Sequence, residues 1–450
     1  MNTLRQKFNK LDTNFKELLS KSSQAFFIQM AGKFFGYLFT ILITRNFGAS
    51  VWGSFAIAFT VLRLARLIGN LGTDKSIVRF ISQYNVKNNW FAIKDIYKKT
   101  FFLLLINGLI LGILLYLLSP IIAKRFFNNQ ELVYGFRILS FGVPFLLINS
   151  LNHTSLRGIK QIKEHTFLRE TSIFLFSIII GSTFIYLFNI QLNENFPHHI
   201  YLSGIIITTV LGIILWYTKS GFFIPKKTNH SVTINYLIKF STPMLLSTSF
   251  LFIMGWIDTL MLGAMDTEKN VGIYNVCVRV SQIITFPLIA VNSIVAPKIS
   301  EFFTSSQFSK LNKYVRNATK LVFLTNFPLF LIIALFPTFI LKLFGEDFTI
   351  GINVLYILLL GKLMTTLSGS VGNFLNMTGN QWVFQNILII TGTLNVILNL
   401  ILIPMYSILG AGIANAISLS LWNIIAVLFI WKKYRINPFL INIKKLQRNA

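Results

Sequence analysis

Residues 101–118 read FFLLLINGLILGILLYLL and contain no charged side chain. The hydrocarbon core of a bilayer is roughly 30 Å thick and takes ~20 apolar helical residues per crossing. Similar stretches recur along the chain, separated by short polar breaks, and the alternating pattern of membrane strands is absent from the sequence. Because backbone polar groups in lipid must be satisfied internally, helices are the remaining way to cross. The sequence therefore predicts an all-α polytopic membrane protein.

The amino-acid composition supports this fold class. Hydrophobic residues make up 54% of the 450 residues and charged residues only 12%, too few to cover a water-facing globule. The one cysteine, Cys277, lies in an apolar stretch, so an intramolecular disulfide framework is excluded. Residues 1–21 carry basic side chains without the apolar core of a cleavable signal peptide.

Basic residues are distributed unevenly among the polar breaks. With a cytoplasmic N-terminus, the inner connections hold most Lys and Arg residues, and the outer connections hold only Arg45, Lys124, Arg125, Lys269 and Lys342. This positive-inside bias predicts a multi-pass protein of the cytoplasmic membrane with both termini in the cytoplasm. About twelve transmembrane helices are expected, at 22–44, 51–72, 97–119, 132–156, 164–188, 200–218, 236–264, 271–295, 319–341, 350–376, 382–404 and 409–431.

The formal net charge of +27 is explained by this topology. Lys and Arg at the inner ends of helices bind anionic lipid headgroups, so a nucleic-acid partner is unnecessary. Residues 1–21 place apolar side chains at helical spacing beside basic ones, which is typical of a helix lying on the cytoplasmic membrane surface. A frayed basic tail is the alternative for this segment.

The two halves of the chain resemble each other. Gly48 and Gly263 each precede a second glycine, Gly53 and Gly272, that is followed by a small or β-branched residue and an aromatic. This pattern predicts two six-helix lobes, and because six is even, both lobes share one orientation in the membrane. The expected organisation is an N-terminal segment 1–21, an N-lobe 22–218, a linker 219–235, a C-lobe 236–432 and a basic tail 433–450.

Five basic residues are expected at membrane depth, where charge is costly and usually faces a cavity or a partner. They lie on polar stripes of four helices, and such stripes describe a wet central cavity. Arginine donates bidentate hydrogen bonds to phosphate and keeps its charge when partly desolvated. A lipid diphosphate would suit this cavity, and the candidate substrate-binding residues are Lys33, Arg63, Arg66, Arg279 and Lys362.

Several of these charges have simpler explanations. Arg63 and Arg66 could pack against Asp258, and Lys362 could bind backbone carbonyls. Asp258 itself admits two interpretations, a structural counter-ion or a site that binds H⁺ or Na⁺ in alternation with the substrate. Among the others, Arg137 and Arg169 are expected to reach the headgroups, and Arg169 could pair with Glu170. Asn386, Asn395 and Asn399 are expected to form interhelical hydrogen bonds.

Enzyme signatures are sparse. The sequence contains no P-loop, no zinc-ligand pair at metalloprotease spacing and no convincing nucleophile elbow. No metal and no cofactor are therefore expected, and transport would depend on an H⁺ or Na⁺ gradient, the substrate gradient or downstream removal of the product. His198 and His199 could serve a membrane glycan polymerase or ligase, but such enzymes usually have a long outer loop, which this chain lacks.

Several short motifs, spread over nearly the whole chain, resemble a known family. Residues 256–263, WIDTLMLG, followed by 271–274, VGIY, look like the W-x-D-x-x-x-L-G and V-G-x-Y stretch of polysaccharide flippases. Further motifs match the same pattern: FG at 47–48, GSF at 53–55, LG at 71–72, RFI at 79–81, APKIS at 296–300, LFG at 343–345 and GAGIA at 410–414. The chain thus resembles the oligosaccharide (O-antigen-type) flippases of the multidrug/oligosaccharidyl-lipid/polysaccharide exporter superfamily.

This resemblance implies two six-helix lobes that form a V and open alternately to each side. It implies a transporter, not an enzyme, that moves an undecaprenyl-diphosphate-linked oligosaccharide to the outer leaflet of a bacterial cytoplasmic membrane. Polysaccharide polymerase machinery is an implied partner. Related peptidoglycan-precursor flippases use basic residues of helices 1, 2 and 8, the helices that carry Lys33, Arg63 or Arg66, and Arg279 here. The alternative within the superfamily is a multidrug or cation antiporter.

Overall fold

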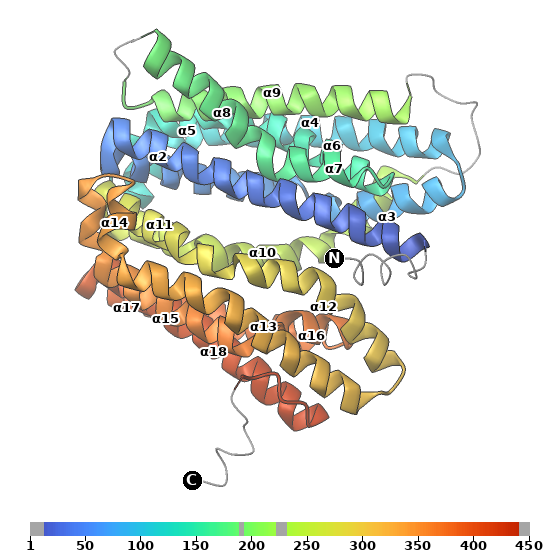
Figure 1. The fold of residues 1–450 in the computed structure, drawn as a ribbon. Coiled ribbons are helices and arrows are strands. Elements are labelled where there is room, and N and C mark those ends of the chain that lie inside the picture. Colours follow the sequence, from blue (N-terminus) through green and yellow to red (C-terminus); the bar gives the residue numbers. More distant parts are fainter. Residues whose placement is uncertain (1–12, 189–192, 222–231, 441–450) are drawn as a thin grey trace, which may run out of the picture. The chain divides into compact units, whose positions relative to one another are not determined.

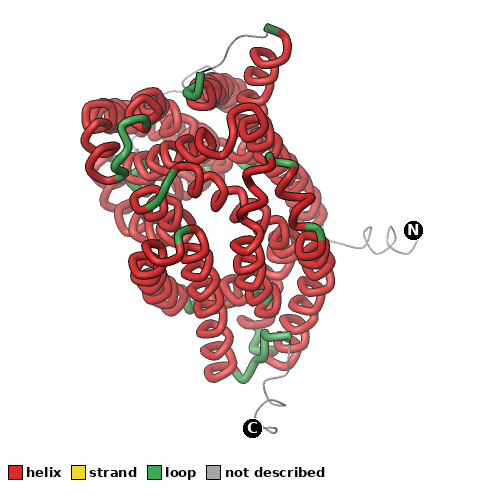
Figure 2. Tube along the Cα trace, turned by 90° about the vertical axis from the view of Figure 1, so that its left-hand side faces the viewer, coloured by secondary structure: helices red, strands yellow, loops and turns green. Residues whose placement is uncertain are grey.

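The computed structural model describes residues 13–188, 193–221 and 232–440. Helices dominate these ranges, and no strand occurs within them (Figure 2). Most of the expected surface helix at 1–21 and of the linker at 219–235, and the end of the tail at 433–450, lie outside the described residues. The predicted all-α membrane fold is confirmed.

Nine helices of the described ranges are long and apolar enough to cross a membrane, or ten if the bent pair α5 and α6 forms one span. The first of them is part of α2 (Thr13–Gly69), which is interrupted at Gly48 by non-helical backbone with φ 82° and ψ −175°. The span-forming part of α2 has 47 residues, roughly 70 Å of helix and more than twice a hydrocarbon core. Gly48 therefore divides it into two runs of spanning length, and the count of twelve stays a prediction.

The chain forms two compact units (Figure 1). Unit 1 contains residues 1–42, 61–125 and 129–248. Its core joins side chains of helices that are far apart in sequence, including Ile77, Ile93, Leu151 and Trp216. Besides parts of α2 and α10, its helices are α3 (Thr73–Val86), α4 (Trp90–Ile121), α5 (Leu132–Ser140), α6 (Gly142–Gly158), α7 (Ile162–Thr166), α8 (Ser172–Ser182) and α9 (Phe196–Ser220), with π-helical turns η2 (Phe167–Thr171) and η3 (Thr183–Leu187).

Unit 2 contains residues 43–60, 126–128 and 249–450. An apolar cluster in this unit includes Val291, Val322, Phe374 and Ile430. The helix α10 (Ile234–Met265) contributes its second half to this unit, and the π-helical turn η1 (Ile122–Phe126) ends in it. The other elements are α11 (Glu268–Gln282), η4 (Ile283–Thr285), α12 (Phe286–Thr304), α13 (Phe308–Leu335), α14 (Pro337–Lys342), η5 (Glu346–Gly351), α15 (Ile352–Ser368), α16 (Val371–Met377), α17 (Gln381–Tyr406) and α18 (Ile408–Tyr434). The lobe boundaries expected from the sequence repeat stay a prediction.

The two glycines that define the sequence repeat meet inside unit 2. A Cβ on Gly53 would lie 1.7 Å from the carbonyl oxygen of Glu268, and a Cβ on Gly272 would lie 2.1 Å from that of Ala49. The second run of α2 and α11 therefore approach each other backbone to backbone, which only glycine permits. Segments from the two halves of the sequence are thus packed together at this end of the helices.

Candidate functional site

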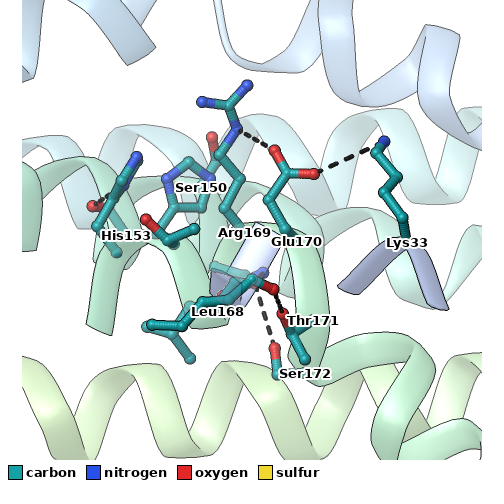
Figure 3. Close-up of polar contacts among 12 residues, drawn as sticks. Lys33, Ser150, His153, Leu168, Arg169, Glu170, Thr171 and Ser172 are labelled. Atoms are coloured by element: carbon teal, nitrogen blue, oxygen red, sulfur yellow. Dashed lines mark hydrogen bonds and ion pairs between the residues drawn. The ribbon is translucent and has the colours of Figure 1, made fainter. Parts of the chain in front are cut away.

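A carboxylate flanked by two cations lies in unit 1 (Figure 3). Glu170 forms an ion pair with Arg169, in which Nε of the arginine and Oε1 of the glutamate are 3.2 Å apart. The other carboxylate oxygen, Oε2, lies 4.0 Å from Nζ of Lys33. The Glu170 side chain is 18% exposed, whereas those of Lys33 and Arg169 are 42% and 51% exposed. One half-buried carboxylate thus pairs with two more exposed cations. The expected pairing of Arg169 with Glu170 is present.

A tight helix contact fixes this arrangement. Gly32 packs against the backbone of Glu170, where a Cβ would meet the Glu170 carbonyl oxygen at 2.5 Å. Thr171 adds a hydrogen bond from Oγ1 to the carbonyl oxygen of Ile28, 2.9 Å away. Residues 167–171 form the π-helical turn η2, a distortion that often marks functional sites. The close approach brings Lys33 beside a carboxylate on another helix.

Two arginines of the second run of α2 join the same group. Arg63 interacts electrostatically with Glu170, Arg66 and Arg169. Arg66 donates from Nη2 to the Ser150 hydroxyl at 3.4 Å, and that hydroxyl donates to Asp74 at 2.5 Å. We call Lys33, Arg63, Arg66 and Arg169, with Glu170, the basic cluster. The sequence-predicted residues Lys33, Arg63 and Arg66 are therefore brought together within unit 1.

The remaining predicted basic residues, Arg279 and Lys362, belong to unit 2. Arg279 donates from Nε to Oδ1 of the buried Asn275 at 3.1 Å, and its Cζ lies 5.0 Å from the ring centroid of Trp52. The cation–π contact and the hydrogen bond hold the guanidinium in place. Lys362 on α15 interacts electrostatically with Asp258.

Asp258 is buried where four helices cross. Its carboxylate accepts hydrogen bonds from Tyr274 at 3.0 Å, Asn399 at 2.7 Å and Asn415 at 2.6 Å, which lie on α11, α17 and α18. The bond from Asn399 to Asp258 joins α17 to α10, as expected for interhelical hydrogen bonding, whereas Asn399 bonds Asn395 at 3.1 Å within α17 itself. Three donors and a nearby lysine satisfy the charge within the protein. This geometry favours the structural interpretation of Asp258.

Replacing Asp258 by asparagine is expected to lower the free energy of unfolding by about 2 to 3 kcal/mol, because an amide presents an NH₂ group to donors that need an acceptor. Thermal unfolding of the purified protein measures the effect. Asp347→Asn is the matched control, since Asp347 is 50% exposed and pairs with Lys269 at the surface. Wild-type stability combined with lost dependence on Na⁺ or pH would instead support ion coupling.

Two features of the basic cluster were not predicted from the sequence. The sequence indicates Glu170 only as a local partner of Arg169, whereas Glu170 also pairs with Lys33, and the sequence does not indicate that Arg169 lies in one group with Lys33 and Arg63. The sequence feature that could have indicated this role of Glu170 is the presence of an acidic residue inside the span expected at 164–188. No group of three His, Cys, Asp or Glu side chains in the described ranges could hold a metal ion.

Comparison with known proteins identifies the family. The model of the family described as polysaccharide biosynthesis protein matches residues 18–303, and the MatE family model matches residues 243–401. The chain is 23% identical over 408 residues to a protein of Haloferax volcanii named probable low-salt glycan biosynthesis flippase Agl15, covering 89% of this chain and 81% of that one.

Solved structures show the same fold. The lipid II flippase MurJ in an inward closed conformation superposes with a TM-score of 0.72 at 17% identity, covering 92% of this chain and 87% of that one. An inward-facing multidrug resistance MATE transporter of the MOP superfamily gives 0.72 at 17% identity, covering 96% and 99%. The resemblance seen in the sequence motifs is confirmed. The chain belongs to the polysaccharide biosynthesis protein family, and it has the fold of the MOP exporter superfamily.

Proposed function

We propose that the protein is a flippase that moves a lipid-linked oligosaccharide across the cytoplasmic membrane of a bacterium, with undecaprenyl diphosphate as the lipid carrier. The basic cluster carries this proposal, since its four cations outnumber its one carboxylate and leave a net positive charge for a diphosphate. The family assignment and the names of Agl15 and MurJ, both called flippases, support it. The repeat unit would be an O-antigen, a capsule or a similar glycan.

Alternating access would move the substrate. A charged, hydrated headgroup faces a high barrier in hydrocarbon, and a polar path through the protein lowers that barrier. The contact between Gly53 and Gly272 joins segments of the two sequence repeats, so this end must separate for the path to open there. Because the sequence has no P-loop, an H⁺ or Na⁺ gradient or removal of the glycan by polymerase machinery would supply the direction.

The competing functions make different demands on the residues. A multidrug or cation antiporter needs acidic groups that attract its substrate, whereas Asp258 is enclosed by donors and Glu170 by cations. A glycan polymerase or ligase needs positioned catalytic groups. Of the two candidate catalytic histidines, His198 and His199, His198 is buried against Gly135. A Cβ on Gly135 would lie 2.6 Å from Nε2 of His198. The basic cluster therefore favours the flippase.

Glu170 would act as an internal counter-anion within this mechanism. It neutralises Lys33 and Arg169 while the cluster is empty and gives way to the diphosphate when substrate arrives. A substrate that replaces an existing anion is bound less tightly, and its release is correspondingly easier.

Glu170→Gln is expected to tighten the binding of inorganic diphosphate about three- to tenfold, because the competing charge is removed. Translocation should slow in the same variant. Isothermal titration of the purified protein with inorganic diphosphate measures the first effect. Glu164→Gln is the matched control, as Glu164 pairs with Lys219 at 3.2 Å outside the cluster. Equal affinities for Glu170→Gln and wild type would contradict the counter-anion role.

A leaflet-accessibility assay in cells tests the function itself. Deletion of the gene should retain the lipid-linked glycan in the inner leaflet, and the wild-type gene should restore its exposure. The gene carrying Arg279→Ala should restore little of the glycan exposure, because this variant lacks the guanidinium that is held over the Trp52 ring. Exposure of the glycan in the deletion strain, with no second flippase gene present, would exclude this function.

A further inference from the structure

An apolar groove of about 380 Å³ lies on unit 1, and none of its lining residues belongs to the basic cluster. It runs along α4 and is closed on the other side by residues around the joint between α5 and α6. The exposed fractions of Ile113 and Phe141 are 58% and 60%, so the groove opens to the surface. Its lining includes Leu105, Leu109, Ile113, Leu117, Phe141 and Ile148.

Two features of the backbone shape this groove. Gly108 lets α4 approach α6 closely, since a Cβ on Gly108 would lie 2.6 Å from Cα of Pro144, and Gly112 lies against the end of α5, where a Cβ would lie 2.9 Å from the carbonyl oxygen of Ser140. Beside this contact, α5 and α6 meet at an angle of 44°. The apolar groove therefore lies between α4 and the joint of α5 and α6, next to the glycines.

One end of the groove carries a positive charge. Cζ of Arg137 lies 5.1 Å from the ring centroid of Tyr116, and this ring contacts Phe141 at 5.8 Å between centroids. Tyr116 and Phe141 both line the groove. The Nε atom of Arg137 is buried and has no hydrogen-bond partner in the described ranges, where no carboxylate lies within ion-pair distance of this side chain. An anion would neutralise the charge of Arg137 and accept hydrogen bonds from its guanidinium.

We propose that this groove is a binding site for a resident anionic phospholipid, with one acyl chain along α4 and its phosphate at Arg137. The walls from Leu105 to Leu117 extend roughly 18 Å along the helix, close to the depth of one leaflet. Tyr116 lies near one end of the span expected at 97–119, and aromatic side chains at the ends of membrane spans commonly meet the headgroups. A single acyl chain with a negative headgroup therefore fits both the length and the charge of the site.

The test measures lipid retention and is independent of transport. Purified protein is titrated with phosphatidylglycerol and with phosphatidylcholine of identical acyl chains, and bound lipid is counted by native mass spectrometry. Wild type should retain one phosphatidylglycerol at about tenfold lower concentration than phosphatidylcholine. Arg137→Gln should remove this preference without removing the binding of the chain.

Two tryptophan substitutions test the location. Ile113→Trp fills the groove and should weaken the retention of both lipids about tenfold or more, whereas Ile106→Trp should behave as wild type. Ile106 is the matched control because it is 57% exposed on the same helix and does not line the groove. Equal retention by the two variants, no headgroup preference in wild type, or displacement of phosphatidylglycerol by equimolar polyprenyl phosphate would overturn the proposal.

Discussion

Leucine in place of Gly272 is expected to abolish glycan translocation and to open the contact between α11 and the second run of α2. The nearest atom to a Cβ at this position is the backbone carbonyl oxygen of Ala49, at 2.1 Å, and backbone cannot rotate away as a side chain can. The two segments must therefore separate. The two segments come from the two sequence repeats. The expected result is therefore a protein that stays open at the end where Gly53 and Gly272 lie.

Thiol labelling measures the opening. A reporter cysteine replaces Ala49, which is 1% exposed, in a chain whose buried Cys277 has been replaced by serine. A membrane-impermeant maleimide should label the reporter only in the Gly272→Leu background. Gly255→Leu is the control, because a Cβ at Gly255 has no atom within 4 Å. A protected reporter together with normal translocation in Gly272→Leu would refute the role given to this contact.

Arg63→Ala is expected to reduce translocation by about one to two orders of magnitude. A charge-assisted hydrogen bond to phosphate contributes about 1.5 to 3 kcal/mol, and each 1.4 kcal/mol is roughly tenfold in affinity. Arg63→Lys should retain part of the activity, since it keeps the charge and loses the bidentate fork. Initial translocation rates in proteoliposomes measure these differences.

Lys75→Ala provides the control for Arg63. Lys75 is an exposed cation of α3, outside the basic cluster, so its removal changes the net charge equally and should leave the rate unchanged. Thermal unfolding of each variant separates a lost contact with substrate from lost structure. Equal rates for Arg63→Ala and Lys75→Ala would remove the basic cluster from the mechanism.

The fold class could be predicted from the sequence because a lipid environment restricts the backbone to few structures. Every backbone polar group needs an internal partner, so runs such as 101–118 have to be helical. The break at Gly48 was also indicated, by the glycine between the spans expected at 22–44 and 51–72. The bend between α5 and α6 was not indicated, since the span expected at 132–156 is one apolar stretch and its hydrophobic pattern does not mark a bend.

The basic cluster was only partly readable. Helical stripes of polar residues indicated Lys33, Arg63 and Arg66, and the structure brings these three together. The role of Glu170 depends on the contact between Gly32 and the π-helical turn η2, and spacing within one helix does not report which two helices touch. The same holds for Lys362, whose neighbour Asp258 lies 104 positions earlier in the chain.

Translocation by the purified protein is the most direct test of its role as a flippase. Protein is reconstituted into liposomes that carry an undecaprenyl-diphosphate-linked oligosaccharide on both leaflets, and a glycosidase added outside trims the exposed glycans. Wild-type protein should render nearly all of the glycan accessible, whereas protein-free liposomes and the Arg63→Ala variant should stop near one half. Accessibility that stays near one half with folded wild-type protein, under an imposed H⁺ or Na⁺ gradient as well as without one, would contradict the account.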